Sequence, residues 1–212
     1  MPYTVRNILA FPQHTGITPS LEDKNHLLAL RGFVSDFIVY NAKKYGSLAI
    51  ETNSYSTLLD IAPQDYEGAQ PFSKYSNGFI DVKTLDINPS SGADYIADIT
   101  KTNINIPNDS FDYILMTEVL EHTLQPFDAA RELYRLLKPN GILFISIPCN
   151  FRIHGPLPDS WRFTHFGLQQ GLFTNDKWEW LECNALDFSE RTLFPIDYSC
   201  VVRKRIQSLT SS

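Results

Sequence analysis

One short apolar segment limits the folds open to this chain more than any other feature. Residues 113–116 (YILM) are too few to form the core of a helix and follow a turn signal at residues 108–110 (NDS), so they predict a buried strand of a parallel sheet. A polar cluster comes directly after the strand: Thr117, Glu118, Glu121 and His122. In open α/β sheets, ligands bind in the crevice beyond the carboxyl ends of the strands. The segment therefore predicts a strand with a ligand site at its end.

Similar segments recur along the chain. Further strands are predicted at residues 57–61, 82–86, 95–98 and 142–147. A helix is predicted at residues 126–137, because Pro126 suits the first helical position and residues 138–141 (KPNG) form a terminator. Strands separated by helical segments indicate βαβ units. The pattern thus predicts an α/β fold with a mostly parallel sheet.

The two ends of the chain have their own patterns. Residues 1–19 predict an irregular lead-in, and Ser20 with Asp23 resembles a capping box. This box would start a long amphipathic helix whose pattern stops at Gly46, and the helix could cover a ligand cleft as a lid. At the C-terminus an antiparallel hairpin is predicted from two longer strands, residues 178–186 and 193–205.

Composition excludes several classes of protein. An apolar fraction of 43% over 212 residues predicts one folded domain, and a net charge of −6 argues against a nucleic-acid partner. Cys149, Cys183 and Cys200 are odd in number and widely spaced, so they suggest neither a disulfide framework nor a zinc site, and we predict a cytoplasmic protein. We expect no signal peptide and no membrane partner, since no apolar run approaches the roughly 18 residues of a membrane span.

Three acids follow predicted strands in order. Asp60 and Asp86 each end a strand, and Asp98 closes a third. An acid at the end of the second strand of a βαβ unit is placed to accept hydrogen bonds from ribose hydroxyls. Aspartate is also common at strand ends as a turn former, so each acid alone has a structural alternative. The series of three favours a nucleoside ligand.

These motifs together resemble the class I S-adenosylmethionine-dependent methyltransferases, specifically the small-molecule, type 11-like group. Residues 111–115 (FDYIL) followed by 118–122 (EVLEH) resemble the family's fourth strand, and residues 132–143 (ELYRLLKPNGIL) resemble its next helix and fifth strand. Residues 161–164 (WRFT) resemble a signature of one subset. The resemblance covers about residues 57–170. It implies a Rossmann-like, seven-stranded, mostly parallel sheet with one antiparallel strand and helices on both faces.

The resemblance also implies how the domain is organised. We expect a single methyltransferase domain over residues 1–212. Its parts would be the lead-in and helix at 1–46, a cofactor-binding core at 57–170 and the hairpin at 178–205.

The resemblance further implies a set of cofactor-binding residues. Asp60 and Ala62 would lie beneath the methionine part of S-adenosylmethionine, and Thr117 would lie below the sulfonium. The nucleoside end would be held by four residues: Asp86 on the ribose, Ile87 against the adenine face, and Asp98 with Ile99 near the adenine amine. The chain departs from the family at the loop after Asp60, where Ala62 and Gln64 replace the usual glycines and the next glycine is Gly68. We expect a longer loop at residues 64–72 that still holds the cofactor.

The candidate catalytic residues are His154, Asp159 and His122, with His154 first because it follows the fifth strand in a loop that could reach the cleft. Arg162 could pair with Asp159. Some relatives hold a divalent metal with a cluster that matches Glu118, Glu121 and His122 plus a later histidine, here His154 or His165. The alternative, which we favour at this stage, is that the cluster shapes the pocket without a metal.

The predicted activity is transfer of a methyl group from S-adenosylmethionine to an oxygen or nitrogen of a small molecule, such as a sugar or another biosynthetic intermediate. The first alternative is a degenerate, non-catalytic binding subunit of the same fold. The second is a metal-dependent RNA ribose methyltransferase, against which the acidic balance weighs. An NAD-dependent oxidoreductase is disfavoured because the loop after Asp60 lacks the glycines that a pyrophosphate needs.

Overall fold

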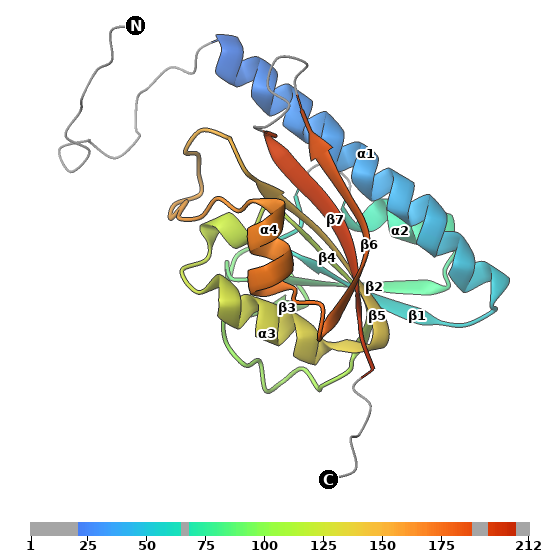
Figure 1. The fold of residues 1–212 in the computed structure, drawn as a ribbon. Coiled ribbons are helices and arrows are strands. Elements are labelled where there is room, and N and C mark those ends of the chain that lie inside the picture. Colours follow the sequence, from blue (N-terminus) through green and yellow to red (C-terminus); the bar gives the residue numbers. More distant parts are fainter. Residues whose placement is uncertain (1–20, 65–67, 188–194, 207–212) are drawn as a thin grey trace, which may run out of the picture.

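The structure, a computed structural model, describes residues 21–64, 68–187 and 195–206, with side chains from residue 24 onward. A twisted sheet of seven strands runs through its centre (Figure 1). The strands are β1 (Ser56–Ile61), β2 (Ile80–Asp86), β3 (Tyr95–Ile96), β4 (Phe111–Thr117), β5 (Leu137–Pro148), β6 (Trp178–Leu186) and β7 (Asp197–Lys204). The helices are α1 (Leu21–Glu51), α2 (Ala69–Ser76), α3 (Pro126–Leu136) and α4 (His165–Gly167), with short helical turns η2 (Leu120–His122) and η3 (Leu168–Leu172).

The order of the strands confirms the predicted topology. The sheet order is β3-β2-β1-β4-β5-β7-β6, and neighbouring strands from β3 to β5 pair in parallel. Strand β7 is antiparallel to both β5 and β6, so it is the one antiparallel strand. The chain order reverses between β1 and β4, and such a switch point opens a crevice at the carboxyl ends of the strands.

Helices cover both faces of the sheet, as predicted. On one face α1 and α2 pack against Leu58 and Phe144, while on the other α3 packs against Ile114 and Leu143 (Figure 1). Consecutive residues of β5 alternate between these two cores, because side chains of a strand point to opposite faces. Each face therefore has its own apolar core.

Several predicted strand boundaries are wrong, among them those of β3 and β5. Strand β3 ends at Ile96 rather than at residue 98, and Asp98 instead turns back to accept a hydrogen bond from the backbone N–H of Thr100. Strand β5 begins at Leu137 rather than at residue 142, because Leu137 pairs with Phe111 and residues 138–141 form an irregularity within the strand. Asn140 in that stretch has a φ of 64°, so turn-like residues bend the strand without ending it.

The long helix is longer than predicted. The predicted apolar stripe is confirmed, since Leu30, Val34 and Phe37 are buried, but the helix passes through Gly46 and ends at Glu51. A Cβ on Gly46 would lie 3.2 Å from the Cβ of Tyr75, so this glycine allows α1 and α2 to pack closely. The predicted capping box at Ser20 lies outside the described residues.

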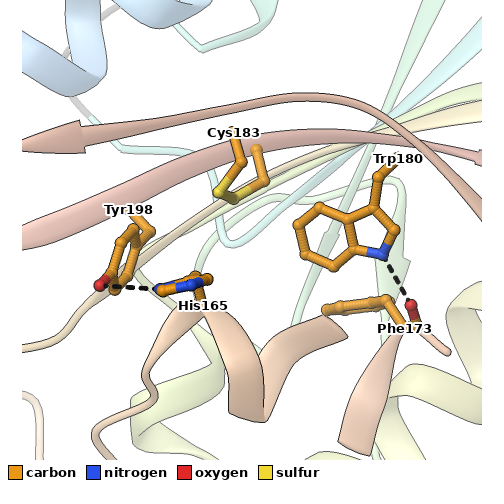
Figure 2. The surroundings of a disulfide bond; sticks show 6 residues. His165, Phe173, Trp180, Cys183 and Tyr198 are labelled. Carbon is orange, nitrogen blue, oxygen red and sulfur yellow. Dashed lines mark hydrogen bonds between the residues drawn. A yellow bond between two sulfur atoms is a disulfide. The ribbon is translucent and has the colours of Figure 1, made fainter. Parts of the chain in front are cut away.

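Two of the cysteines form a disulfide, contrary to the expectation from their odd number and wide spacing. Cys183 of β6 and Cys200 of β7 face each other across the hairpin and are bonded (Figure 2). Beside them, the Tyr198 hydroxyl is 3.4 Å from Nδ1 of His165, and Trp180 donates a hydrogen bond to the carbonyl of Phe173. The hairpin is therefore joined to the segment that follows β5. Among the described residues Cys149 remains a free thiol.

None of the helices in the described ranges has the length and apolarity needed to cross a bilayer.

One aromatic residue lies at the centre of the apolar core beneath α1 and α2. Phe144 of β5 is fully buried, and its ring centroid lies 5.2 Å from that of Phe72 and 5.3 Å from that of Tyr45. Phe144→Ala is expected to lower the free energy of unfolding by about 3–5 kcal/mol, because it leaves a cavity that both helices line. Urea unfolding measures the change. Phe127→Ala, at a side chain that is 48% exposed, should cost far less, and an equal loss in the two variants would contradict this assignment.

Candidate active site

Asp60 ends the first strand in a fully enclosed position. Its side chain is only 3% exposed, and its Oδ2 atom has no hydrogen-bond partner among the described residues. Burial raises the pKa of this carboxyl to about 7. An unpartnered carboxylate at the end of β1 is an unfilled acceptor for a ligand donor or cation.

The loop after Asp60 lacks the usual glycines, but one of its residues adopts a glycine-like conformation and a later glycine lies close to the acid. Ala62 takes a φ of 51°, the left-handed conformation that glycine adopts more easily. Gly68 lies against the acid, since a Cβ there would be 2.6 Å from Oδ2 of Asp60. Helix α2 begins at Ala69, within the stretch predicted as a longer loop. Residues 65–67 of that loop lie outside the described residues.

Asp86 and Ile87 lie at the end of β2. One oxygen of Asp86 accepts a hydrogen bond from the backbone N–H of Asn88, and no bond to the other is seen among the described residues. Ile87 is 69% exposed, which is high for a large apolar side chain. An acceptor next to an exposed apolar surface suits a ribose with a base stacked beside it.

The residues predicted near an adenine amine differ in exposure. One oxygen of Asp98 binds both the backbone N–H and the hydroxyl of Thr100, so its structural role as a turn former is real. Its other oxygen has no partner within the described chain. Ile99 is buried, and its side chain packs in the core.

The end of β4 is buried and tightly bonded. Thr117 is 5% exposed, and the next residue, Glu118, has a φ of 54°. Oε1 of Glu118 accepts a 2.7 Å hydrogen bond from the hydroxyl of Ser146 on β5, while its Oε2 has no hydrogen-bond partner in the described part. Burial raises the pKa of Glu118. The strained backbone directs this carboxyl back over the sheet.

A carboxylate and two imidazoles meet just beyond this strand. Oε1 of Glu121 lies 3.6 Å from Nε2 of His122 and 3.7 Å from Nε2 of His154. The two imidazole ring centroids are 5.0 Å apart. Glu121 is fully buried, and neither of its carboxylate oxygens has a hydrogen-bond partner among the described residues. Of the residues in the predicted cluster, Glu121 and His122 meet here with His154, whereas Glu118 is bonded to Ser146 and His165 lies beside Tyr198.

Hydrogen bonds at the other ring nitrogens set the tautomers of the two histidines. Nδ1 of His122 is 3.0 Å from the carbonyl of Pro158. Nδ1 of His154 is 3.3 Å from the carbonyl of Arg152, its hydrogen-bond partner, and 3.1 Å from Oδ2 of Asp159. Acceptors at these positions favour a proton on Nδ1. Both Nε2 lone pairs are then free on the side of Glu121.

An ion pair supports the loop that carries His154. Arg162 binds both oxygens of Asp159, as the sequence suggested, and Asp159 also accepts the backbone N–H of His154 at 2.8 Å. Burial alone would raise the pKa of Asp159, yet these bonds outweigh it and hold that pKa below its ordinary value. Burial also lowers the pKa of His154, so this imidazole is neutral at neutral pH.

Sequence reasoning missed one acid of this site. Asp197 of β7 is fully buried beside Glu118, and burial, together with the charge of that neighbour, raises its pKa well above the ordinary value. Burial and the charge of Glu118 likewise raise the pKa of Glu121. Asp197 pairs in register with Pro148, the last residue of β5. Only that long-range pairing places it here, and no local signal could have identified it.

A cavity of about 260 Å³ opens onto this cluster. Its floor includes Glu118, His122 and His154, and α1 forms one wall. Gln64, from the loop after Asp60, also lines it. Of the predicted catalytic residues, His122 and His154 line the cavity, and Asp159 contacts His154. Asp60 and Asp86 lie at the ends of β1 and β2, and Asp98 follows β3. Leu27, Leu30 and Val34 of α1 line the cavity, and whether this helix acts as a lid stays a prediction.

A methyltransferase-domain family model matches residues 26–185. The match covers most of the chain and includes the carboxyl ends of β1 to β5. The chain therefore belongs to this family and is a class I S-adenosylmethionine-dependent methyltransferase. The search of curated proteins found no match.

Solved structures with the same fold share little sequence with the chain. A Haloferax volcanii protein solved with the Trm112 methyltransferase activator has a TM-score of 0.56 at 15% identity, over 89% of this chain and 99% of that one. A Burkholderia thailandensis 1,6-didemethyltoxoflavin-N1-methyltransferase, with that substrate and S-adenosylhomocysteine bound, has a TM-score of 0.51 at 16% identity, over 90% and 93%. The [4+2]-cyclase SpnF has a TM-score of 0.53 at 16% identity, over 77% and 81%. At such identities the likeness shows the fold alone.

Proposed function

We propose that the protein transfers the methyl group of S-adenosylmethionine to an oxygen or nitrogen of a small molecule bound in the cavity beside β4. The observation that carries this proposal is the imidazole of His154 in the cavity lining, together with the unpartnered buried carboxylate oxygen of Asp60 near the end of β1. A cavity of about 260 Å³ has room for a small acceptor only. We keep the cytoplasm as the predicted location.

The residues at the strand ends fit the cofactor. Asp60 would accept from, or pair with, the amino end of the methionine part, and Asp86 would accept from the ribose hydroxyls. The exposed side chain of Ile87 would pack on the adenine face, while Asp98 offers its remaining oxygen to the adenine amine. Thr117 lies at the end of β4, between this row and the cavity. When bound, the cofactor supplies an electrophilic methyl group, and the protein's part is to hold the acceptor in line with it.

His154 would remove the proton of the acceptor. Its Nε2 lone pair is free, its ring is held by Asp159, and its lowered pKa keeps it neutral. A sugar hydroxyl, a phenol or an amine has to lose a proton when it is methylated. A positioned base therefore assists each of these acceptors. His122 shares the floor and would orient the acceptor.

His154→Gln is expected to lower kcat by about 10²–10⁴-fold, the usual contribution of a general base, and to leave S-adenosylhomocysteine affinity unchanged. The rate of the wild-type enzyme should fall as pH drops below the lowered pKa of His154, and the variant should lose this inflection. Initial rates of S-adenosylhomocysteine release across pH measure both effects. His165→Gln, outside the cluster, serves as the control. A variant that keeps the wild-type pH profile would remove His154 from the base role.

Isothermal titration calorimetry separates this enzyme from the non-catalytic alternative. The proposal expects saturable binding of S-adenosylmethionine and S-adenosylhomocysteine. Absence of any binding at millimolar ligand would reject it, and the chain would then be a binding subunit that has kept the fold. The cyclase among the structural neighbours shows that this fold also occurs in a protein of another activity.

A second candidate is metal-assisted transfer at the same floor. Atoms of Glu121, His122 and His154 lie within 4.8 Å of one another, and both imidazoles have Nδ1 engaged and Nε2 free. Contacts at Nδ1 of this kind orient histidine ligands, and the unpartnered buried carboxylate of Glu121 completes a donor set that suits zinc or manganese. The residues therefore fit a divalent cation, which would act as a Lewis acid on the acceptor oxygen.

The two candidates make opposite predictions for a chelator. If His154 is the base, EDTA leaves the methylation rate unchanged, because a metal on Nε2 and a proton on Nε2 exclude each other. If the site holds a metal, Zn²⁺ or Mn²⁺ should bind in calorimetry, and His122→Ala and His154→Ala should each weaken binding at least about tenfold. His165→Ala is the matched control. Equal metal affinity in all four proteins would reject the metal site.

A further inference from the structure

The wall of the cavity carries two arginines that the proposed chemistry does not use. Arg31 lies on the face of α1 that also contributes Leu27, Leu30 and Val34 to the cavity, since residues three, four and seven apart share one side of a helix. Arg152 comes from the segment after β5, and its guanidinium carbon is 5.8 Å from the ring centroid of Phe151. Two cations therefore flank the same cavity from separate elements.

Neither cation has an acidic partner in the part of the chain that the structure describes. Other arginines there do pair with carboxylates: Arg131 with Asp128, Arg135 with Glu132, Arg162 with Asp159 and Arg203 with Glu179. The side chains of Arg31 and Arg152 are exposed and make no ion pair with a described carboxylate. Exposed guanidinium groups without partners on a cavity wall are free to bind an anion.

The remaining surfaces of the cavity limit what such an anion can look like. Leu30, Val34 and Phe151 give an apolar wall. The floor ends in the imidazole of His154. Carboxylate and phosphate groups match the planar fork of the arginine side chain. The cavity therefore suits a ligand with three parts: an anionic group at the arginines, an apolar body along the apolar wall, and a nucleophile at His154.

We infer that the methyl acceptor is a small anion, with a carboxylate or phosphate held by Arg31 and Arg152, an apolar body against Phe151 and Val34, and its nucleophile toward His154. This inference rests on the proposed function, because it names the acceptor class of the same cavity.

Aromatic fragments that carry an anionic, a neutral or a cationic group test the inference. Benzoate, phenyl phosphate, benzamide and benzylamine are titrated onto the full chain in the presence of S-adenosylhomocysteine, and saturation-transfer NMR gives each Kd. The two anions should bind about tenfold or more tightly than benzamide, since a charge-assisted bond to arginine contributes at least about 1.4 kcal/mol. Benzylamine should not bind. The double variant Arg31→Gln/Arg152→Gln should reduce the anions to the affinity of benzamide.

The control and the contrary outcomes are specific. Arg131→Gln removes one charge from a side chain that is 69% exposed on α3, outside the cavity lining, and should keep the preference for anions. The inference is overturned if benzamide binds as tightly as benzoate, if the double variant keeps the preference, or if no anion binds up to its solubility limit. Calorimetry of S-adenosylhomocysteine on the same samples separates the two proposals. Cofactor binding without anion preference rejects the acceptor class alone, whereas absence of cofactor binding rejects the function.

Discussion

Asp86→Ala is expected to weaken the binding of S-adenosylhomocysteine about 100-fold and to leave the fold intact. Two hydrogen bonds from ribose hydroxyls to a charged acceptor would be lost, and at about 1.5 kcal/mol each they account for a factor of this size. Asp86 lies at the surface end of β2, so its removal leaves no cavity in the core. Calorimetry measures the Kd, and circular dichroism confirms the fold.

Two further variants separate ligand contact from turn structure. Asp86 also accepts a hydrogen bond from the backbone N–H of Asn88, and Asp86→Asn retains an acceptor for that bond. If the acid serves only the turn, the asparagine variant binds like the wild type. If it serves the ribose, binding falls in both variants. Asp81→Ala removes an acid that is 60% exposed on the same strand and should leave the Kd unchanged.

The fold could be predicted because it follows from local patterns in the sequence. The apolar run at residues 113–116 is buried in β4, and Pro126 starts α3 as its fixed φ requires. Strand alternation with helices then leaves few topologies, because parallel crossovers are right-handed. Asp60 and Asp86 could be placed at strand ends for the same reason.

Features that depend on pairing between distant segments could not be predicted. Strands β6 and β7 are in one register at Trp180 and Val202, and a bulge after Trp180 shifts that register by one residue. Only after this shift does Cys183 face Cys200. Nothing in the spacing of the cysteines encodes a bulge, so the disulfide was missed. The helix through Gly46 is a similar case, since its neighbour Tyr75 on α2 decides what the glycine does.

Asp60→Asn is expected to stabilise the protein without cofactor at pH 8, by at most about 4 kcal/mol. Burial raises the pKa of Asp60 from 3.8 to about 7, so the folded state binds this proton more tightly than the unfolded state does. The stabilising contribution is therefore complete below about pH 4 and is lost as pH rises through 7. Asparagine never carries the charge and avoids this loss.

The difference between variant and wild type isolates Asp60 from the other buried acids. Glu118, Glu121 and Asp197 also have raised pKa values, but they are present in both proteins and cancel. Urea unfolding at pH 5 and pH 8 should give a small difference at the lower pH and a large one at the higher. Asp81→Asn, at an exposed site, should show no such change. A constant difference across pH would mean that Asp60 ionises normally.

The pH dependence of S-adenosylhomocysteine binding should show what Asp60 contributes to function. The amino group of bound S-adenosylhomocysteine would stabilise the ionised carboxylate, so binding releases the proton of Asp60. The affinity of the wild type is thus expected to rise up to about tenfold per unit as pH increases toward 7, and then to level off. Asp60→Asn should bind more weakly and without this slope. If the more stable variant binds the ligand as tightly as the wild type at pH 8, the carboxylate does not touch the cofactor. Stability gained together with affinity lost would identify Asp60 as an acid kept for binding at the expense of the fold.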